Sequence, residues 1–140
     1  MNRADTRTPA QLYALLFGIT LLAVGILGFL ADSSFETGSN VQGSDFIIFE
    51  VNGWHNLVHI ASGIAGIALS RRADSARLFA LGFGAVYLLV TILGFIDGNN
   101  VLGLIPVDAA DNVLHLAIAA LGIGAGLASS PTPRTRREAV

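Results

Sequence analysis

The chain has no cysteine among its 140 residues. This absence excludes disulfide bonds, thiolate metal ligands and cysteine nucleophiles, and it leaves imidazole and carboxylate groups as the side chains best able to bind a transition metal. Charge is also scarce, since Asp, Glu, Lys and Arg make up only 13% of the residues, whereas a soluble domain has about a quarter. The formal net charge of −2 gives no basic field, so no nucleic-acid partner is expected.

Signatures of catalysis and of ion transport are missing as well. The sequence contains no nucleophile elbow, no phosphate-binding glycine loop and no HExxH motif. No acidic residue falls in the middle of an apolar segment, which argues against a proton-coupled transporter or an ion channel of familiar design. The sequence therefore predicts that the protein is not an enzyme.

What the chain does have is hydrophobic sequence, at 53% of residues and a mean hydropathy of +0.66. Four nearly uncharged segments are each close to the roughly 20 residues that cross a bilayer as a helix. A soluble bundle would need a charged stripe on its outward faces, and these segments have none. We expect an all-α fold, a polytopic membrane four-helix bundle over residues 11–128. The predicted spans are residues 11–30, 53–70, 78–96 and 110–128, with an N-terminal tail at 1–10 and a disordered C-terminal tail at 129–140.

The basic residues lie on one side of the predicted membrane. They occur before the first segment, between the second and third, and after the fourth: Arg3, Arg7, Arg71, Arg72, Arg77, Arg134, Arg136 and Arg137. The other two loops carry Asp32, Glu36, Asp45, Glu50, Asp97 and Asp108, with no Lys or Arg. The positive-inside rule then predicts a multi-pass plasma-membrane protein with both termini in the cytoplasm.

The second half of the chain repeats the first. Residues 51–61 match residues 107–117 at an offset of 56, sharing an Asn and a His, and the first and third segments match at an offset of 66. Two tandem copies of a two-helix hairpin would point the same way across the membrane. The repeat therefore predicts a pseudo-twofold axis along the membrane normal.

The repeated segments also carry the unusual polar residues. His55 and His59 are four residues apart on one helix face, and Asp111 and His115 occupy the equivalent positions. If the second and fourth helices meet, three imidazoles and a carboxylate converge near the outer surface. That set suits a divalent transition metal such as Zn²⁺, Cu²⁺ or Fe²⁺. The neighbouring residues able to hydrogen-bond such ligands are Asn56 and Asn112.

Two other interpretations fit the same residues. The His and Asn side chains can simply hydrogen-bond across the helix interface, which would make the protein a structural or accessory membrane component. Alternatively, His59 and His115, one from each repeat, can hold a haem between them. The partners expected are the lipid bilayer, and either other membrane proteins or a second copy of the chain.

A set of motifs resembles a known family. These are Leu27-Gly28-Phe29, the run from His55 to His59, Arg71-Arg72, Leu93-Gly94-Phe95 and the run from Asp111 to His115. Together they resemble an uncharacterised family of small bacterial four-helix integral membrane proteins, catalogued as a domain of unknown function. The resemblance covers about residues 11 to 128 and implies a plasma-membrane protein, but it supplies no substrate and no catalytic residue.

Overall fold

The computed structural model describes residues 7–129. Within that range the chain forms four helices: α1 (Pro9–Gly28), α2 (Gly53–Leu69), α3 (Ala73–Asp97) and α4 (Ala109–Ala128). The expected all-helical architecture is therefore confirmed. Three helices, α1, α3 and α4, are long and apolar enough to cross a membrane. The fourth, α2, has 17 residues and does not meet this description. Most of the two predicted tails, with Arg3, Arg134, Arg136 and Arg137, lies outside the described residues.

Local capping sets where α1, α2 and α4 begin. Thr8 and Gln11 form a capping box, so α1 starts at Pro9 rather than at the predicted Gln11. Asn52 caps α2 by accepting a hydrogen bond from the His55 N–H, and Asp108 caps α4 in a box with Asp111. α3 is longer than predicted and contains Arg77. It stops at Asp97 because Gly98, with φ of 84°, adopts the left-handed conformation of a helix C-terminus.

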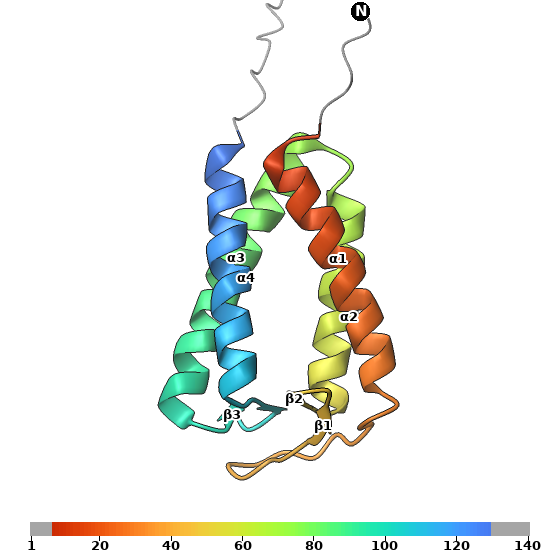
Figure 1. The fold of residues 1–140 in the computed structure, drawn as a ribbon, viewed down its shortest axis with the longest axis vertical. Coiled ribbons are helices and arrows are strands. Elements are labelled where there is room, and N and C mark those ends of the chain that lie inside the picture. The colour runs from red at the N-terminus through yellow and green to blue at the C-terminus, as the bar shows by residue number, and fades with distance from the viewer. Residues whose placement is uncertain (1–6, 130–140) are drawn as a thin grey trace, which may run out of the picture.

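The helices associate in two pairs, α1 with α2 and α3 with α4 (Figure 1). Glycines allow the backbones to approach closely. A Cβ on Gly18 of α1 would lie 3.0 Å from the Gly63 carbonyl oxygen and 2.8 Å from the Ile67 nitrogen. In the other pair, a Cβ on Gly84 would meet the Ala119 oxygen and the Ile123 nitrogen at 3.0 and 2.9 Å.

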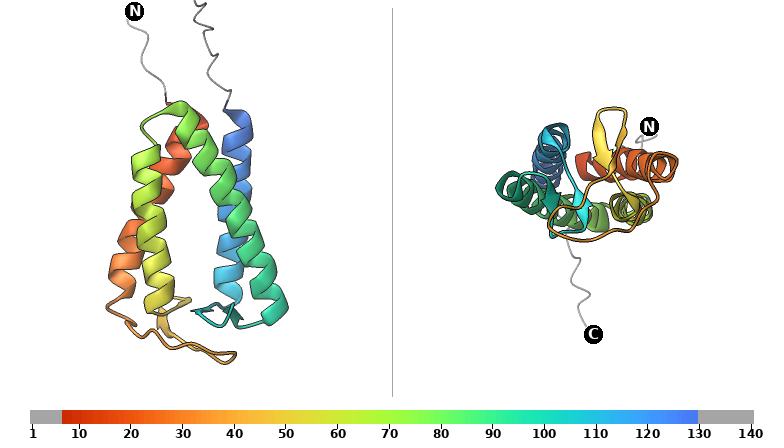
Figure 2. Two further views of the ribbon diagram at one scale, coloured as in Figure 1. Left: turned by 180° about the vertical axis from the view of Figure 1, so that it is seen from behind. Right: turned by 90° about the horizontal axis from the view of Figure 1, so that it is seen from below.

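The two pairs meet at one end of the molecule and separate toward the other (Figures 1 and 2). We call the meeting end, which carries Arg71 and Arg72 in the turn between α2 and α3, the arginine end. The core extends from this end to the middle of the helices and consists of small and aromatic residues with one isoleucine: Ala10, Tyr13, Ala14, Ala76, Phe79, Ala80, Tyr87, Ile118 and Ala119. The Tyr13 hydroxyl donates to the Ile118 carbonyl of α4 at 3.0 Å. Ser129, predicted to begin the tail, is buried and accepts a hydrogen bond from the Ala10 N–H.

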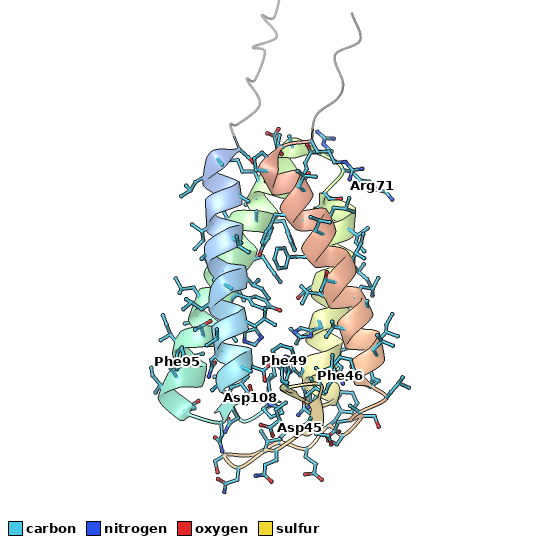
Figure 3. The ribbon with its side chains drawn as sticks, viewed as in Figure 1. Asp45, Phe46, Phe49, Arg71, Phe95 and Asp108 are labelled. Atoms are coloured by element: carbon cyan, nitrogen blue, oxygen red, sulfur yellow. The ribbon has the colours of Figure 1, made fainter. Side chains whose placement is uncertain are left out.

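Two short antiparallel hairpins close the opposite end, which we call the hairpin end. They are β1 (Ser44–Phe46) with β2 (Phe49–Val51), and β3 (Asn100–Val101) with β4 (Ile105–Pro106). Figure 3 shows Asp45 and Asp108 here, far from Arg71. Hydrogen bonds cross between the two halves: Asn52 Nδ2 donates to the Leu104 carbonyl at 2.8 Å, and the Gly38 N–H donates to the Gly103 carbonyl at 2.8 Å.

Candidate histidine site

Three imidazoles lie together between the two helix pairs, toward the hairpin end. His55 and His59 come from adjacent turns of α2, and His115 comes from α4. One ring nitrogen of each lies within 4.8 Å of the others. The rings of His55 and His59 have centroids 4.4 Å apart, and those of His55 and His115 are 5.9 Å apart. All three side chains are buried, with exposures of 2% for His55, 8% for His59 and 3% for His115.

The hydrogen bond of His55 fixes which of its nitrogens carries the proton. Nδ1 lies 2.9 Å from the backbone carbonyl oxygen of Glu50. A carbonyl oxygen only accepts, so Nδ1 must be the donor, and a neutral ring then has a lone pair on Nε2. That Nε2 atom is buried and has no hydrogen-bond partner among residues 7–129. The Glu50 carbonyl therefore fixes the orientation of the His55 ring, and Nε2 is left unpaired.

The other two histidines also have unpaired nitrogens. Nδ1 of His59 and Nδ1 of His115 are buried without a partner in the described part of the chain. An unpaired buried polar group costs about 1–3 kcal/mol. Several such atoms in one cluster indicate a site that is completed by a group other than the protein, such as a water or an ion.

Asp111, the fourth predicted ligand, lies outside the group of converging nitrogens. Its Oδ2 accepts hydrogen bonds from two backbone N–H groups, that of Asp108 at 3.2 Å and that of Glu50 at 3.1 Å. The first bond belongs to the α4 capping box and the second reaches the β1–β2 hairpin of the other helix pair. Glu50 thus binds Asp111 through its N–H and His55 through its carbonyl.

Asn56 and Asn112, predicted to support the cluster, lie against glycines instead. The Asn56 amide sits beside Gly28 of α1, and the Asn112 amide sits beside Gly94 of α3. Asn56 Nδ2 donates to the Asp32 carbonyl at 2.9 Å. No hydrogen bond joins either amide to a histidine within the residues that the structure describes. Both asparagines therefore connect the two helices of a pair.

Tyr87 is a site residue that the sequence did not single out as one. It is buried on α3, and its ring packs edge-on to His115 with centroids 5.1 Å apart. Its place in the middle of an apolar segment was the available signal, but that place alone does not tell a packed tyrosine from one facing a site. The main chain of Glu50 gave no sequence signal at all, because any residue supplies the same N–H and carbonyl.

Two cavities adjoin the cluster, and the three histidines line both. The first, of about 130 Å³, is bounded by α1, α2, α4 and the β1–β2 hairpin, where Figure 3 labels Phe46 and Phe49. The second, of about 120 Å³, is bounded by α2, α3, α4 and Ile105 of β4. An engineered cavity of about 150 Å³ holds a single benzene ring. A haem macrocycle is several times larger than either volume, and the haem interpretation of His59 and His115 stays a prediction.

Comparison with known proteins places the chain in a family. A family model described as a domain of unknown function (DUF4383) matches residues 11–128. No curated protein and no solved structure matches the chain.

Proposed function

The chain belongs to this family of unknown function, and we propose from its own residues that it is an integral membrane protein that binds one divalent transition metal. The metal ligands would be His55, His59 and His115. The observation that carries the proposal is the convergence of three buried imidazoles, each with an unpaired ring nitrogen. No catalytic activity is proposed. The family supplies no activity that conflicts with this assignment.

The ligand chemistry agrees with a first-row metal. Metal–nitrogen bonds of about 2.0–2.1 Å in a tetrahedral site place ligand nitrogens about 3.3 Å apart. The nitrogens already lie within 4.8 Å, so small side-chain rotations bring them to that spacing. The bond from His55 Nδ1 to the Glu50 carbonyl is the support that metal-bound histidines usually have. Three histidines and a fourth position facing a cavity suit Zn²⁺, and the same ligands accept Cu²⁺ or Fe²⁺.

The membrane placement rests on helix length and charge. Three helices have the length and composition of membrane spans. α2 packs along α1, and its 17 residues extend about 26 Å, so it would run through the same layer. Arg7, Arg71 and Arg72 belong to the arginine end, which by the positive-inside rule would be cytoplasmic. In this proposed orientation both termini would lie in the cytoplasm, and the histidines would lie toward the outer surface of the plasma membrane.

The duplicated hairpin is supported by equivalent contacts in the two helix pairs. The close approach of Gly18 to Gly63 and Ile67 corresponds, at the offsets of the sequence repeat, to that of Gly84 to Ala119 and Ile123. Asn56 beside Gly28 corresponds in the same way to Asn112 beside Gly94. We therefore propose that the protein consists of two parallel-oriented copies of one hairpin around a pseudo-twofold axis. Each copy would contribute a metal-binding histidine from an equivalent position, His59 in the first and His115 in the second.

The alternative is a structural or accessory role in which the histidines only hold the helix pairs together. One observation favours it: the Glu50 backbone joins His55 of one pair to Asp111 of the other. Against it, Nδ1 of His59 and of His115 makes no such bond within residues 7–129. A purely structural histidine should pair its nitrogens, so the metal interpretation accounts for more of the geometry.

Metal titration of the purified protein tests the proposal. The chain has three histidines and no cysteine, so a protein made with a histidine-free affinity tag offers no imidazole or thiolate ligands besides these three histidines. After treatment with a chelator in detergent, the wild type should bind about one Zn²⁺ per chain in isothermal titration. His59→Ala and His115→Ala should each weaken binding by about 100-fold or more, since even the loss of a residue that only hydrogen-bonds to a metal ligand costs roughly 10–100-fold.

Glu36→Ala is the control for these variants. It removes an exposed carboxylate from the loop at the hairpin end that is not among the converging ligand atoms, so Zn²⁺ affinity should change by less than about threefold. Circular dichroism of every variant checks that the helices are retained. A folded wild type that binds no Zn²⁺, Cu²⁺ or Fe²⁺ would overturn the proposal and leave the structural role.

A further inference from the structure

A polar cavity lies at the arginine end, between the start of α1 and the end of α2. It is lined by Arg7, Gln11, Ser70 and Arg71 and has a volume of about 450 Å³, within the roughly 300–1,000 Å³ of small-molecule sites. Arg7 precedes α1 and Arg71 follows α2 (Figure 3 labels Arg71 at this end), so the packing of the two helices brings both arginines to one cavity.

The side-chain and carbonyl oxygens at this cavity already accept hydrogen bonds. The Ser70 carbonyl accepts from Gln11 Nε2 at 3.1 Å, and Gln11 Oε1 accepts from the Thr8 N–H at 3.1 Å. No carboxylate lines the cavity among the described residues, and neither Arg7 nor Arg71 forms a hydrogen bond or an ion pair within residues 7–129. What the cavity offers is therefore guanidinium N–H donors and positive charge, which together favour an anion.

A third arginine at this end has a structural contact instead. Arg77 Nε donates to the Ser129 carbonyl at 2.8 Å. Gln11, its counterpart at the 66-residue offset, makes the equivalent bond to the Ser70 carbonyl. Ser70 and Ser129 are the C-cap residues of α2 and α4. In the first helix pair a neutral side chain thus makes this contact, and the arginines of the cavity are not needed for it.

The repeat also indicates that the hairpin fold does not require the two arginines of the cavity. The residue that corresponds to Arg7 is Ala73, and the one that corresponds to Arg71 at the 56-residue offset is Leu127. The second copy therefore forms the same kind of helix pair without these charges. A role outside the packing of the helices accounts for their presence in the first copy.

We propose that this cavity binds the phosphate group of an anionic phospholipid in the cytoplasmic leaflet, and that the guanidinium groups of Arg7 and Arg71 donate hydrogen bonds to the phosphate oxygens. The site involves none of the histidines and no metal. It rests on the proposed function only for the placement of the arginine end at the cytoplasmic surface of the membrane.

The level of the cavity in the bilayer identifies the source of the phosphate. The 20 residues of α1 extend about 30 Å as a helix, which equals the thickness of the hydrocarbon core. Arg7 and Arg71 flank the helices and would lie among the headgroups, where lipid phosphates are the nearest anions. Guanidinium groups bind phosphate strongly and often through two parallel hydrogen bonds. Exposed Leu12 and Leu16 follow on α1 and would contact the acyl chains of the bound lipid.

Isothermal titration of dihexanoylphosphatidylglycerol into the wild-type protein in a non-ionic detergent tests the site. One saturable equivalent per chain is expected. Dihexanoylphosphatidylcholine carries the same phosphodiester, but its trimethylammonium group is repelled by the arginines, so it should bind at least about tenfold more weakly. Equal binding of the two lipids, or no saturable binding of phosphatidylglycerol to the folded protein, would overturn the proposal.

Arg72 provides a control for the positive charge itself. It is exposed in the same turn as Arg71 but does not line the cavity. Arg7→Ala and Arg71→Ala should each weaken phosphatidylglycerol binding by about tenfold or more, because each removes charge-assisted hydrogen bonds. Arg72→Ala should change it by less than about threefold, because salt screens an exposed charge that makes no contact. An equal loss in all three folded variants would overturn the proposal, since general attraction to the positive end would then explain the binding.

Inorganic phosphate distinguishes the two sources of the anion. It should displace the lipid only at concentrations at least about tenfold higher than the lipid itself requires, because it lacks the contacts of the acyl chains with apolar side chains. Free phosphate that binds as tightly as the lipid would overturn the lipid assignment. His115→Ala should bind phosphatidylglycerol like the wild type, so a failure of the metal site and a failure of the lipid site can be told apart.

Discussion

The side-chain amide of Asn112 lies in the space that a Cβ atom on Gly94 would occupy. Asn56 has the same relation to Gly28 in the other helix pair. Each asparagine is buried, and the Oδ1 atom of each has no conventional hydrogen-bond partner in the described part of the chain. A glycine Cα–H facing a buried amide oxygen is a weak hydrogen-bond donor of a kind common at helix interfaces. These glycine–asparagine contacts hold the helices of each pair together near the hairpin end.

Adding a methyl group to either glycine should therefore separate the paired helices. We expect Gly94→Ala and Gly28→Ala each to lower the free energy of unfolding by about 1–3 kcal/mol, the usual cost of overpacking. Gly82→Ala is the control on α3, because a Cβ there meets nothing within 4 Å, and it should stabilise the helix by up to about 1 kcal/mol. Denaturant unfolding in detergent micelles measures the free energy of unfolding of all three variants. Equal stability of Gly94→Ala and Gly82→Ala would contradict the close packing of Asn112 against Gly94.

Asp111 should act as a structural link between the helix pairs. In Asp111→Ala, the Glu50 N–H loses its acceptor and α4 loses part of its capping box. We expect a loss of about 1–2 kcal/mol in stability and faster hydrogen exchange at the Glu50 amide. Asp111→Asn keeps one oxygen acceptor and should restore part of the protection. Unchanged exchange at Glu50 in the alanine variant would show that this bond does not hold the hairpin.

Metal binding should weaken as the pH falls. Protons compete with the metal for the imidazole lone pairs, so binding is present at high pH and is lost on acidification. Zn²⁺ titrations at successively lower pH should show affinity falling by up to about tenfold per pH unit for each proton released, once the pH is low enough to protonate the imidazoles. Glu36→Ala should show the same pH dependence, since its exposed carboxylate is not among the converging ligand atoms. A Zn²⁺ affinity that stays unchanged at a pH where imidazole NMR signals of the metal-free protein report protonation would mean that the histidines are not the ligands.

The absence of cysteine makes the membrane orientation directly measurable. Ser39→Cys lies in the exposed loop at the hairpin end, and Arg71→Cys lies in the exposed turn at the arginine end. In intact cells, a membrane-impermeant maleimide should label the first variant at once and the second only after permeabilisation, as the positive-inside rule requires. Labelling of Arg71→Cys in intact cells would reverse the orientation and place the histidines near the cytoplasmic surface.

The residues of the candidate site were accessible from the sequence to different degrees. His55, His59 and His115 were identified because an i, i+4 pair and its repeat are local patterns, and the structure brings their nitrogens together. The role of Asp111 was not identified, because a carboxylate in the first turn of a helix serves equally well as a metal ligand and as a helix cap. Here the cap and the Glu50 N–H take the carboxylate.

What the sequence by itself determined were the features that depend on neighbouring residues: four helices, the separation of charge and the repeat. The tertiary structure decided which faces meet. Small residues such as Ala14 and Ala80 let the helix pairs meet closely at the arginine end, and the pairs therefore diverge toward the hairpins. That divergence creates the cavities and leaves the imidazole nitrogens unpaired. The sequence could not reveal it, because it depends on contacts between residues far apart in the chain that no local pattern encodes.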